Sequence, residues 1–411
     1  SIENNLINLT FDIEESPKFY VEKINIFGNN ITREDVIRNN LIVDEGDPFN
    51  ELLQTKSVNN LKSLNFFSKV DTEIINSENP NKKIINITVE EKPTGEIMAG
   101  AGVGTTGGTL AFGVSENNFL GRGIEFSSDL SVSSETLKGL ISINNPNYKG
   151  SNRSLNTSIE STITDRLTDF GYKSNKTGFS LGSGFEFYDD LYWNTGVSTY
   201  VEKLETDATA SATMKKQEGS YFDTYFNQTF SYDKRNQRYK TSNGYISRFT
   251  QNIPLISDTY TLTNGYDYKI YNQWLDESIV SLGFYLKATN SLSGDNVKLS
   301  DRLYLPSTKL RGFESGKVGP KDGADYIGGN YASTINLATT LPQILPSLQN
   351  TNFSIFLDAA NVWGVDYSSS VADGSEIRSS IGIAVDFFTP IGPLNFSLSE
   401  AITKGKNDIT E

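Results

Sequence analysis

Between residues 222 and 232 the chain reads Phe222-Asp223-Thr224-Tyr225-Phe226-Asn227-Gln228-Thr229-Phe230-Ser231-Tyr232. Side chains alternate between the two faces of a β-strand. One face of this stretch carries large aromatic residues, namely Phe222, Phe226, Phe230 and Tyr232. The other face carries polar residues, namely Asp223, Asn227, Thr229 and Ser231. One face suits lipid and the other suits water, so the stretch predicts a strand of a transmembrane β-barrel.

Similar alternating runs, separated by turn residues, fill the chain from Gly95 onward. They cover Ser154–Ile163, Gly244–Asn252, Tyr260–Tyr271, Ser278–Thr289, Gly329–Leu341, Asn352–Trp363, Ser379–Thr389 and Leu394–Ala401. At about twenty residues for each strand and its connection, residues 94–411 accommodate roughly sixteen antiparallel strands. Beyond Ala401 only a polar turn and a few residues follow.

A soluble β-sandwich, or a chain of them, is the alternative interpretation. The chain contains 24 Phe and 20 Tyr and has a mean hydropathy of −0.38. This composition favours a barrel that has a polar lumen and aromatic girdles. No apolar run reaches the roughly eighteen residues of a membrane-spanning helix. Only helices and closed barrels satisfy their backbone groups within a membrane, which again favours the barrel.

Composition also excludes several classes of function. Acidic residues outnumber basic ones by 50 to 36, giving a net charge of −14, which argues against a nucleic-acid partner. The chain has no Cys and no His, so disulfides, thiolate sites and histidine catalysis or ligation are excluded. No phosphate-binding loop, metal-ligand spacing or nucleophile and base pair stands out. We therefore expect no catalytic residue, no metal and no cofactor, and a protein that is not an enzyme.

Residues 18–93 differ in texture from the rest and predict a small α+β domain. Its elements follow the order strand, helix, helix, strand, strand. The first strand is expected at Phe19–Phe27, and the first helix is capped by Thr32 with Asp35 in a capping box. The second helix is expected at Asn50–Leu64, and the last two strands at Phe66–Ile75 and Lys83–Lys92. Residues 1–17, where Asn8–Ile13 predicts a strand, resemble the end of a similar preceding domain. We therefore expect a longer native chain, and a hinge at Pro93-Thr94-Gly95.

Leu310-Arg311-Gly312-Phe313 lies within a long polar loop, at about residues 291–326, between two predicted strands. Loops of this length without secondary structure are uncommon and are usually functional or disordered. If the arginine lies inside the lumen, it needs a carboxylate to offset its desolvation. The alternative is that Arg311 is a solvated loop residue.

Glycines crowd the segment Glu96–Gly113, which we expect to form the first strand of the barrel. They are Gly100, Gly102, Gly104, Gly107 and Gly108. Glycine weakens the packing of a strand and allows a neighbouring backbone to approach closely. The segment is therefore either a bulged or tightly packed wall, or a strand to which another chain can pair.

Five stretches, in this order along the chain, resemble the BamA family of outer-membrane β-barrel assembly insertases. They are Phe19–Ile24 with Gly28-Asn29, Leu64–Val70, Leu310–Phe313 followed by Gly319-Pro320, Phe356–Asp358 with Val362-Trp363, and Thr389–Leu394. Each stretch alone is weak, whereas the ordered set is specific. The resemblance implies one POTRA domain, the last before the membrane, followed by the transmembrane barrel. It also implies one further strand after the polar turn that follows Ala401, so we expect about fifteen complete strands with the last strand missing.

The resemblance also implies roles for particular residues. The loop folds into the lumen, and Arg311 pairs with Asp358 on a later strand. The family's further glutamate is replaced by Ala338, so Asp386 is expected to act as a second partner of Arg311, and Ala360 stands where glycine is usual. The glycine-rich first strand forms a weak lateral seam with the last strand, and Glu45 contacts a lipoprotein subunit of an assembly complex.

By this resemblance the protein is an insertase of the bacterial outer membrane with its POTRA domain in the periplasm. Its partners are unfolded outer-membrane β-barrel clients, lipoprotein subunits and the lipid bilayer. A polypeptide-secretion translocon of the same superfamily is the close alternative. A passive porin or receptor is a further alternative, and it would need no POTRA domain.

Overall fold

The computed structural model describes residues 2–3, 6–7, 17–104, 107–238, 240–275, 278–342, 351–367, 371, 376–389 and 392–411. The strand predicted at Asn8–Ile13 lies outside the described residues. The chain divides into two compact units. Unit 1 contains residues 1–96 with the turn 116–126, and unit 2 contains residues 97–115 and 127–411. The turn 116–126 is thus grouped with the residues of the N-terminal unit.

Unit 1 has the element order that the sequence predicts. Its elements are β3 (Tyr20–Phe27), α1 (Glu34–Arg38), α2 (Glu51–Ser63), β4 (Phe67–Asn76) and β5 (Lys82–Glu91), with the short pair β1 (Ile2–Glu3) and β2 (Leu6–Ile7) before them. Strand β5 is central, parallel to β3 and antiparallel to β4. The apolar side chains of Ile24, Ile37, Leu61 and Ile85 are buried together in the core of this unit.

The predicted capping box of the first helix is wrong. The residue before α1 is Arg33, whose side chain caps nothing, and Asp35 bonds the backbone N–H of Val36 instead. Thr32 is buried, and its hydroxyl accepts a hydrogen bond of 2.8 Å from the side-chain amide of Asn118. Thr32 therefore fastens the turn 116–126 rather than the helix.

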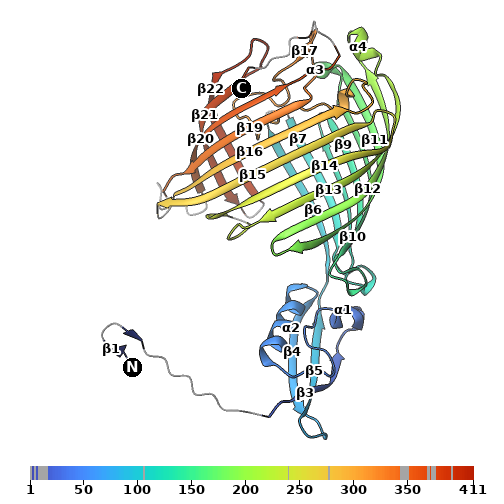
Figure 1. Cartoon of the computed structure of the whole chain (residues 1–411), viewed down its shortest axis with the longest axis vertical. Helices are drawn as coiled ribbons and strands as arrows, with labels where there is room; N and C mark the ends of the chain where they lie inside the picture. The colour runs from blue at the N-terminus through green and yellow to red at the C-terminus, as the bar shows by residue number, and fades with distance from the viewer. Residues whose placement is uncertain are drawn as a thin grey trace. The chain divides into compact units, whose positions relative to one another are not determined.

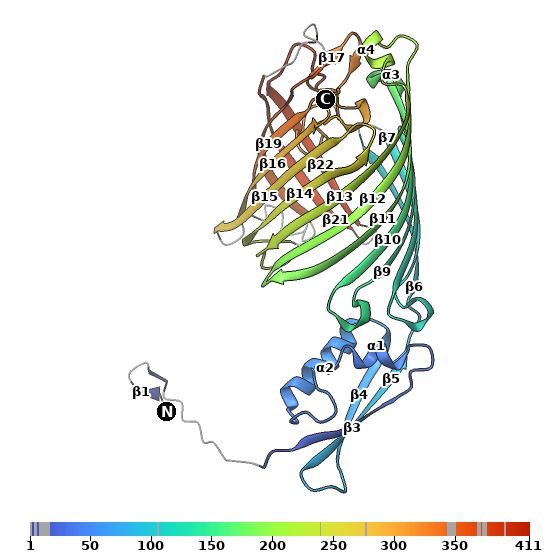
Figure 2. The same ribbon diagram turned by 45° about the vertical axis from the view of Figure 1, so that its right-hand side comes forward.

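Unit 2 is built on one sheet of fifteen strands, in agreement with the predicted barrel. The strands are β6 (Gly95–Gly104), β7 (Gly107–Glu116), β8 (Glu125–Ser133), β9 (Thr136–Asn145), β10 (Ser154–Arg166), β11 (Tyr172–Tyr188), β12 (Leu191–Thr206), β13 (Gly219–Asp233), β14 (Gly244–Ser257), β15 (Thr261–Leu275), β16 (Ser278–Ser291), β19 (Tyr331–Thr340), β20 (Thr351–Trp363), β21 (Arg378–Thr389) and β22 (Gly392–Thr403). Each neighbours the next in chain order, and the sheet curls around a lumen (Figures 1 and 2).

Short elements connect or line these strands. They are the helices α3 (Leu167–Phe170) and α4 (Ala212–Lys215), the 3-10 turns η1 (Phe119–Gly121), η2 (Tyr148–Gly150) and η3 (Leu299–Asp301), and the two-residue strands β17 (Lys321–Asp322) and β18 (Asp325–Tyr326). Among the described residues, no helix is both long enough and apolar enough to cross a membrane.

The glycine-rich segment Glu96–Gly113 is two strands rather than one. Gly100, Gly102 and Gly104 lie on β6, whereas Gly107 and Gly108 lie at the start of β7. Gly107 has a φ of +113°, a conformation that L-residues with a side chain rarely adopt. The prediction of a single strand rested on the crowding of glycines, which fall on both strands and therefore do not mark the connection between them.

Glu91, at the end of β5, fixes the segment that carries Thr32. Its carboxylate accepts backbone N–H bonds from Asn30 and Ile31, both at 2.9 Å, and from Thr32 at 2.6 Å. Burial alone would raise the pKa of the Glu91 carboxyl, but these hydrogen bonds outweigh it and hold the pKa below its usual range. The charged form is thus the one that the fold stabilises.

We predict that Glu91→Gln loosens residues 30–32, because a neutral amide bonds these N–H groups less strongly, at a cost of about 1–2 kcal/mol. A carboxyl whose pKa is lowered on folding adds stability at neutral pH that is lost as the pH falls through the folded-state pKa. Hydrogen exchange of the three amides should therefore show reduced protection in the variant at pH 7, with the difference from wild type shrinking in acid. Equal protection at pH 7 would contradict this role.

Candidate functional site in the barrel lumen

The connection between β16 and β19, residues 292–330, folds into the lumen. Its apolar side chains Leu303, Leu305, Leu310, Phe313 and Val318 are buried in one cluster. That cluster also contains the inward-facing side chains of Ala332, Ala360 and Val362 on β19 and β20. Two members of the predicted quartet, Leu310 and Phe313, are each only 1% exposed and anchor the loop to the barrel wall.

Arg311 and Asp358 form an ion pair through two hydrogen bonds. The guanidinium donates from Nε at 2.7 Å and from Nη2 at 2.8 Å, one bond to each carboxylate oxygen. The Asp358 side chain is fully buried and that of Arg311 is 23% exposed. The backbone N–H of Arg311 and the side-chain amide of Asn336 also donate to this carboxylate. The structure therefore brings together the two residues that the resemblance paired.

Phe356 provides the surface on which the guanidinium rests. Phe356 and Asp358 are two residues apart on β20 and therefore share one face of the strand. In the structure the guanidinium carbon of Arg311 lies 3.3 Å from the centroid of the Phe356 ring. Gly382 on β21 leaves room for the ring, because a Cβ there would lie 2.6 Å from its edge. Phe356 and Asp358 thus hold the same cation by a cation–π contact and an ion pair.

Gly312 brings the loop close to the last two strands. Its φ is +83°, and a Cβ at this position would lie 2.9 Å from the hydroxyl of Ser399 on β22 and 3.6 Å from the Cβ of Ser380 on β21. Both the conformation and the space therefore require glycine. The quartet thus combines two apolar anchors, one cation and one point of close backbone approach.

The expected second partner of Arg311, Asp386, lies elsewhere. Its carboxylate accepts a hydrogen bond from Asn395 on β22, and no described contact joins it to Arg311. Asn336 on β19, two residues before Ala338, supplies the additional contact to Asp358, at 2.8 Å. A neutral amide donor therefore takes the place in which a second carboxylate was expected. Ala360 is buried in the apolar cluster beneath the loop, where its methyl group adds to the packing.

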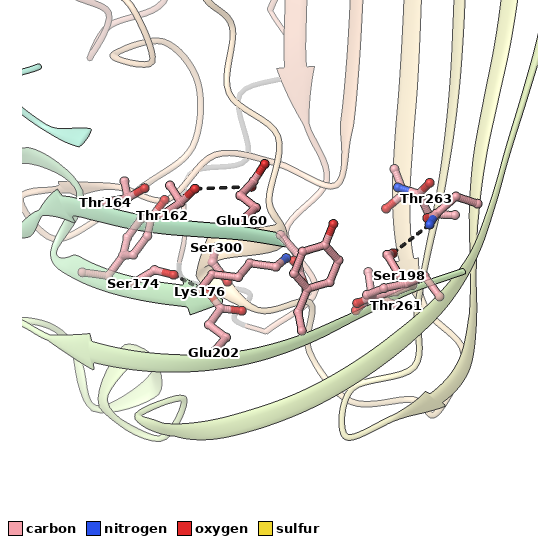
Figure 3. A pocket seen from close by; sticks show the side chains of 16 residues that line it. Glu160, Thr162, Thr164, Ser174, Lys176, Ser198, Glu202, Thr261, Thr263 and Ser300 are labelled. Carbon is pink, nitrogen blue, oxygen red and sulfur yellow. Dashed lines mark hydrogen bonds between the residues drawn. The ribbon is translucent and has the colours of Figure 1, made fainter. Parts of the chain in front are cut away.

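A buried lysine, which the sequence analysis missed, fastens the beginning of the loop. The ammonium of Lys298 lies 2.7 Å from Glu202 on β12 and 2.8 Å from Asp223 on β13, and all three side chains are at most 2% exposed. Ser174 on β11 donates to Glu202 at 2.6 Å. Figure 3 shows Ser174, Lys176 and Glu202 lining a polar cavity of about 300 Å³. Two features of the sequence could have indicated these ion pairs. They are Asp223 on the polar face of its strand and the charged residues within Lys298–Arg302.

Three more ion pairs hold the loop and the segments around it. Arg302 pairs with Asp366, Lys317 with Asp169, and Arg378 with Asp408. The segment after β22 also bonds the loop backbone. The backbone N–H of Glu314 donates to the carbonyl oxygen of Ile409 at 3.0 Å, and the backbone N–H of Glu411 donates to the carbonyl oxygen of Gly312 at 3.1 Å. The loop is therefore tied to strands on several sides of the lumen.

The remaining predicted residues are the glycines of β6 and β7 and Glu45 in unit 1. At Gly102 nothing lies within 4 Å of an added Cβ, and at Gly100 and Gly108 the nearest atoms are 4.0 and 3.8 Å away. Packing within the described chain thus does not require these glycines. In unit 1, Glu45 accepts a hydrogen bond of 3.0 Å from the backbone of Ile24 and lies 3.5 Å from Arg38. Its side chain remains 44% exposed.

We predict that Arg311 and Asp358 are energetically coupled. Removing one partner of a buried pair leaves an uncompensated charge, so Arg311→Gln and Asp358→Asn should each destabilise the protein by about 3–5 kcal/mol. The double variant should lose less than the sum of both, by at least about 1 kcal/mol. Urea unfolding of the detergent-solubilised protein measures this. Losses that simply add would show that the contact is not formed.

Lys298 should contribute more to stability than an exposed loop lysine. Lys298→Met leaves two buried carboxylates without their cation, which should cost about 3–5 kcal/mol. Lys309→Met is the matched control, since Lys309 pairs with Asp267 at 3.0 Å with side chains 32% and 46% exposed. Such exposed pairs contribute at most about 1 kcal/mol. Equal shifts of the unfolding midpoint in the two variants would contradict the proposed anchor.

Known proteins resemble this chain over nearly its whole length. The BamA outer membrane protein assembly factor of Neorickettsia risticii is 24% identical over 413 residues, which is 98% of this chain and 55% of that protein. The corresponding protein of Neisseria meningitidis is 25% identical, covering 99% of this chain and 57% of its own length. The chain thus spans about half the length of these relatives.

Solved structures show the same fold. The crystal structure of BamA from Haemophilus ducreyi lacking POTRA domains 1–3 superimposes with a TM-score of 0.87 at 24% identity, covering 97% of this chain and 84% of that one. CdiB from Acinetobacter baumannii gives a TM-score of 0.58 at 12% identity, covering 96% of this chain and 72% of its own. The resemblance to BamA inferred from the five sequence stretches is confirmed at the level of the fold.

Two family descriptions match the two parts of the chain. Residues 19–92 match the POTRA family, described as the surface antigen variable number repeat. Residues 118–411 match the Omp85 superfamily domain, and this match covers well over half of the chain. The chain therefore belongs to the Omp85 superfamily.

Proposed function

We propose that this protein is an insertase that folds β-barrel precursors and inserts them into the bacterial outer membrane. In this proposal client strands pair at a weak lateral seam between β6 and β22. The similarity to outer membrane protein assembly factors supports the proposal. The observation that carries it is the exposure of the two terminal strands of the sheet.

The strand order of the sheet runs from β22 to β6. On β22, Phe396 and Leu398 are exposed, and so are Asn395 and Ser397 on the opposite face. On β6 the consecutive residues Ile97 and Met98, which point to opposite faces, are 86% and 48% exposed. Strands at an edge can offer N–H and C=O groups to another chain, which adds a strand by backbone hydrogen bonding. Such an edge suits a client strand.

The open space at Gly100 and Gly102 supports the same function. Packing within the described chain does not require these glycines, which argues against the alternative of a tightly packed wall. A strand without side chains allows an incoming backbone to approach closely. We propose that a client strand uses this space.

Unit 1 would lie in the periplasm and receive partners there. Glu45, held by Ile24 and Arg38 but still 44% exposed, is proposed to contact a lipoprotein subunit of an assembly complex. Strand β4 lies at the edge of its three-stranded sheet and is available for strand addition by a client segment.

The loop in the lumen bears on the alternatives. A passive porin or a secretion translocon needs a path along the lumen, whereas residues 292–330 are tied across it by buried ion pairs. A translocon would have to release these contacts during transport. An insertase that works at its lateral edge leaves them in place, so the geometry favours the insertase.

The direct test is reconstitution of the chain into lipid vesicles with a urea-denatured outer-membrane β-barrel protein as client. We predict faster client folding than in empty vesicles, measured by protease protection of the folded barrel. Equal rates in the two kinds of vesicle would overturn the proposal.

The double variant Gly100→Val and Gly102→Val tests the seam itself. It should leave the protein's own unfolding unchanged, because both positions are open, and should slow client folding at least about fivefold, equivalent to roughly 1 kcal/mol. Gly139→Val on β9 is the matched control, since nothing lies within 4 Å of an added Cβ there either. Identical client kinetics in both variants would exclude β6 as the site of pairing.

A further inference from the structure

A second cavity in the lumen has a strongly basic lining. It has a volume of about 510 Å³ and lies between the inward-folding loop and strands β14, β15, β16 and β19. Five cationic residues line it, namely Arg235, Arg248, Lys269, Lys309 and Arg311. Among the described residues of this lining, Asp267 alone is acidic. The cavity is therefore positive in a chain whose net charge is −14.

Three of the five cations are already paired with carboxylates. Arg235 bonds Asp233 at 2.7 Å, Lys309 bonds Asp267 at 3.0 Å, and Arg311 bonds Asp358. These three carboxylates balance the charges of Arg235, Lys309 and Arg311, and the charges of the other two cations remain unbalanced.

Arg248 and Lys269 are the two cations that remain. Across the described parts of the chain the side chain of neither residue forms a hydrogen bond or an ion pair. The Lys269 ammonium lies only over the Tyr271 ring, at 5.0 Å from its centroid. In the strand register Arg248 stands opposite Asp267, whose carboxylate bonds Lys309, and Lys269 stands opposite Gly283. Two positive charges therefore face the cavity without a partner.

The arrangement suits an anion of charge close to −2. Both cations come from the neighbouring strands β14 and β15, so the strand register fixes the positions of their backbones relative to each other. Charge-assisted hydrogen bonds to arginine and lysine are about twice as strong as neutral ones. A phosphate monoester carries about −1.5 to −2 charges at pH 7, whereas a single carboxylate would leave one cation unbalanced.

We propose that this cavity is a binding site for a phosphate-bearing anion, with Arg248 and Lys269 as its direct ligands. Arg311 lies in the same lining, so a bound phosphate adds negative charge beside the loop quartet. The phosphate can belong to a free ion or to the headgroup of an anionic phospholipid, and the experiment separates these two sources. The proposal is independent of the insertase function.

The test uses the full chain in non-ionic detergent at low ionic strength, because exposed charges are screened by salt. Calorimetric titration with inorganic phosphate should show one saturable site. The double variant Arg248→Gln and Lys269→Gln should raise the dissociation constant at least tenfold. Lys203→Gln is the matched control, because Lys203 is 65% exposed and pairs with Glu205 outside the cavity.

A second variant keeps both cations. Ala338 lines the same cavity on β19, and Ala338→Glu would supply an internal carboxylate there. We expect this variant also to weaken phosphate binding at least tenfold, while circular dichroism and the unfolding midpoint show that the barrel remains folded. Unchanged binding in this variant would contradict the assigned location.

The lipid arm compares nanodiscs of phosphatidylglycerol with nanodiscs of phosphatidylcholine, and counts lipids retained after detergent extraction by native mass spectrometry. One retained phosphatidylglycerol that is lost in the double variant would support the site and identify a headgroup as the source, even if free phosphate does not bind. Saturable binding of inorganic phosphate, without a retained lipid, would identify the free ion as the source of the phosphate. Binding of neither ligand, or equal binding by the double variant and wild type, would overturn the proposal.

Discussion

The ion pair between Arg311 and Asp358 is the contact on which the lumen of this protein depends. A fully buried carboxylate is tolerated only when its charge is offset and its oxygens are hydrogen-bonded. Here Arg311, its own backbone N–H and Asn336 supply those bonds. The pair therefore fixes the tip of a loop that arrives from a different part of the chain, and Phe356 fixes the plane of the guanidinium.

The rest of the loop follows from this constraint. Leu310 and Phe313 pack on the barrel wall on either side of the arginine, while Lys298 fastens the start of the loop to β12 and β13. Gly312 allows the loop to touch Ser399, which belongs to the last strand of the sheet. The interior is thus braced, whereas the terminal strands β6 and β22 remain exposed. The proposed pairing with client strands requires both features, a fixed interior and exposed terminal strands.

The sequence predicted the parts of the structure that rest on periodicity and on ordered motifs. Alternating faces revealed the barrel, and the five stretches identified the loop and its partner Asp358. Contacts between distant residues were less accessible. The Lys298 cluster depends on three strands and one loop that only the folded chain brings together, and Thr32 was taken for a helix cap because its tertiary partner Asn118 is 86 residues away. The place of Phe356 beside Asp358 is likewise explained only by tertiary contacts, because its ring lies under the Arg311 guanidinium and occupies the space left by Gly382.

The proposed pairing of a client strand with β6 can be measured directly. Because the chain contains no cysteine, single cysteines can be introduced without background. We would place one at Gly102 and another at Gly139 in separate variants, and scan cysteines along the terminal strand of a client stalled during folding. We predict disulfide crosslinks to position 102 that recur at every second client residue, and none to position 139. Crosslinks that are absent from position 102, or equally strong at both positions, would contradict it.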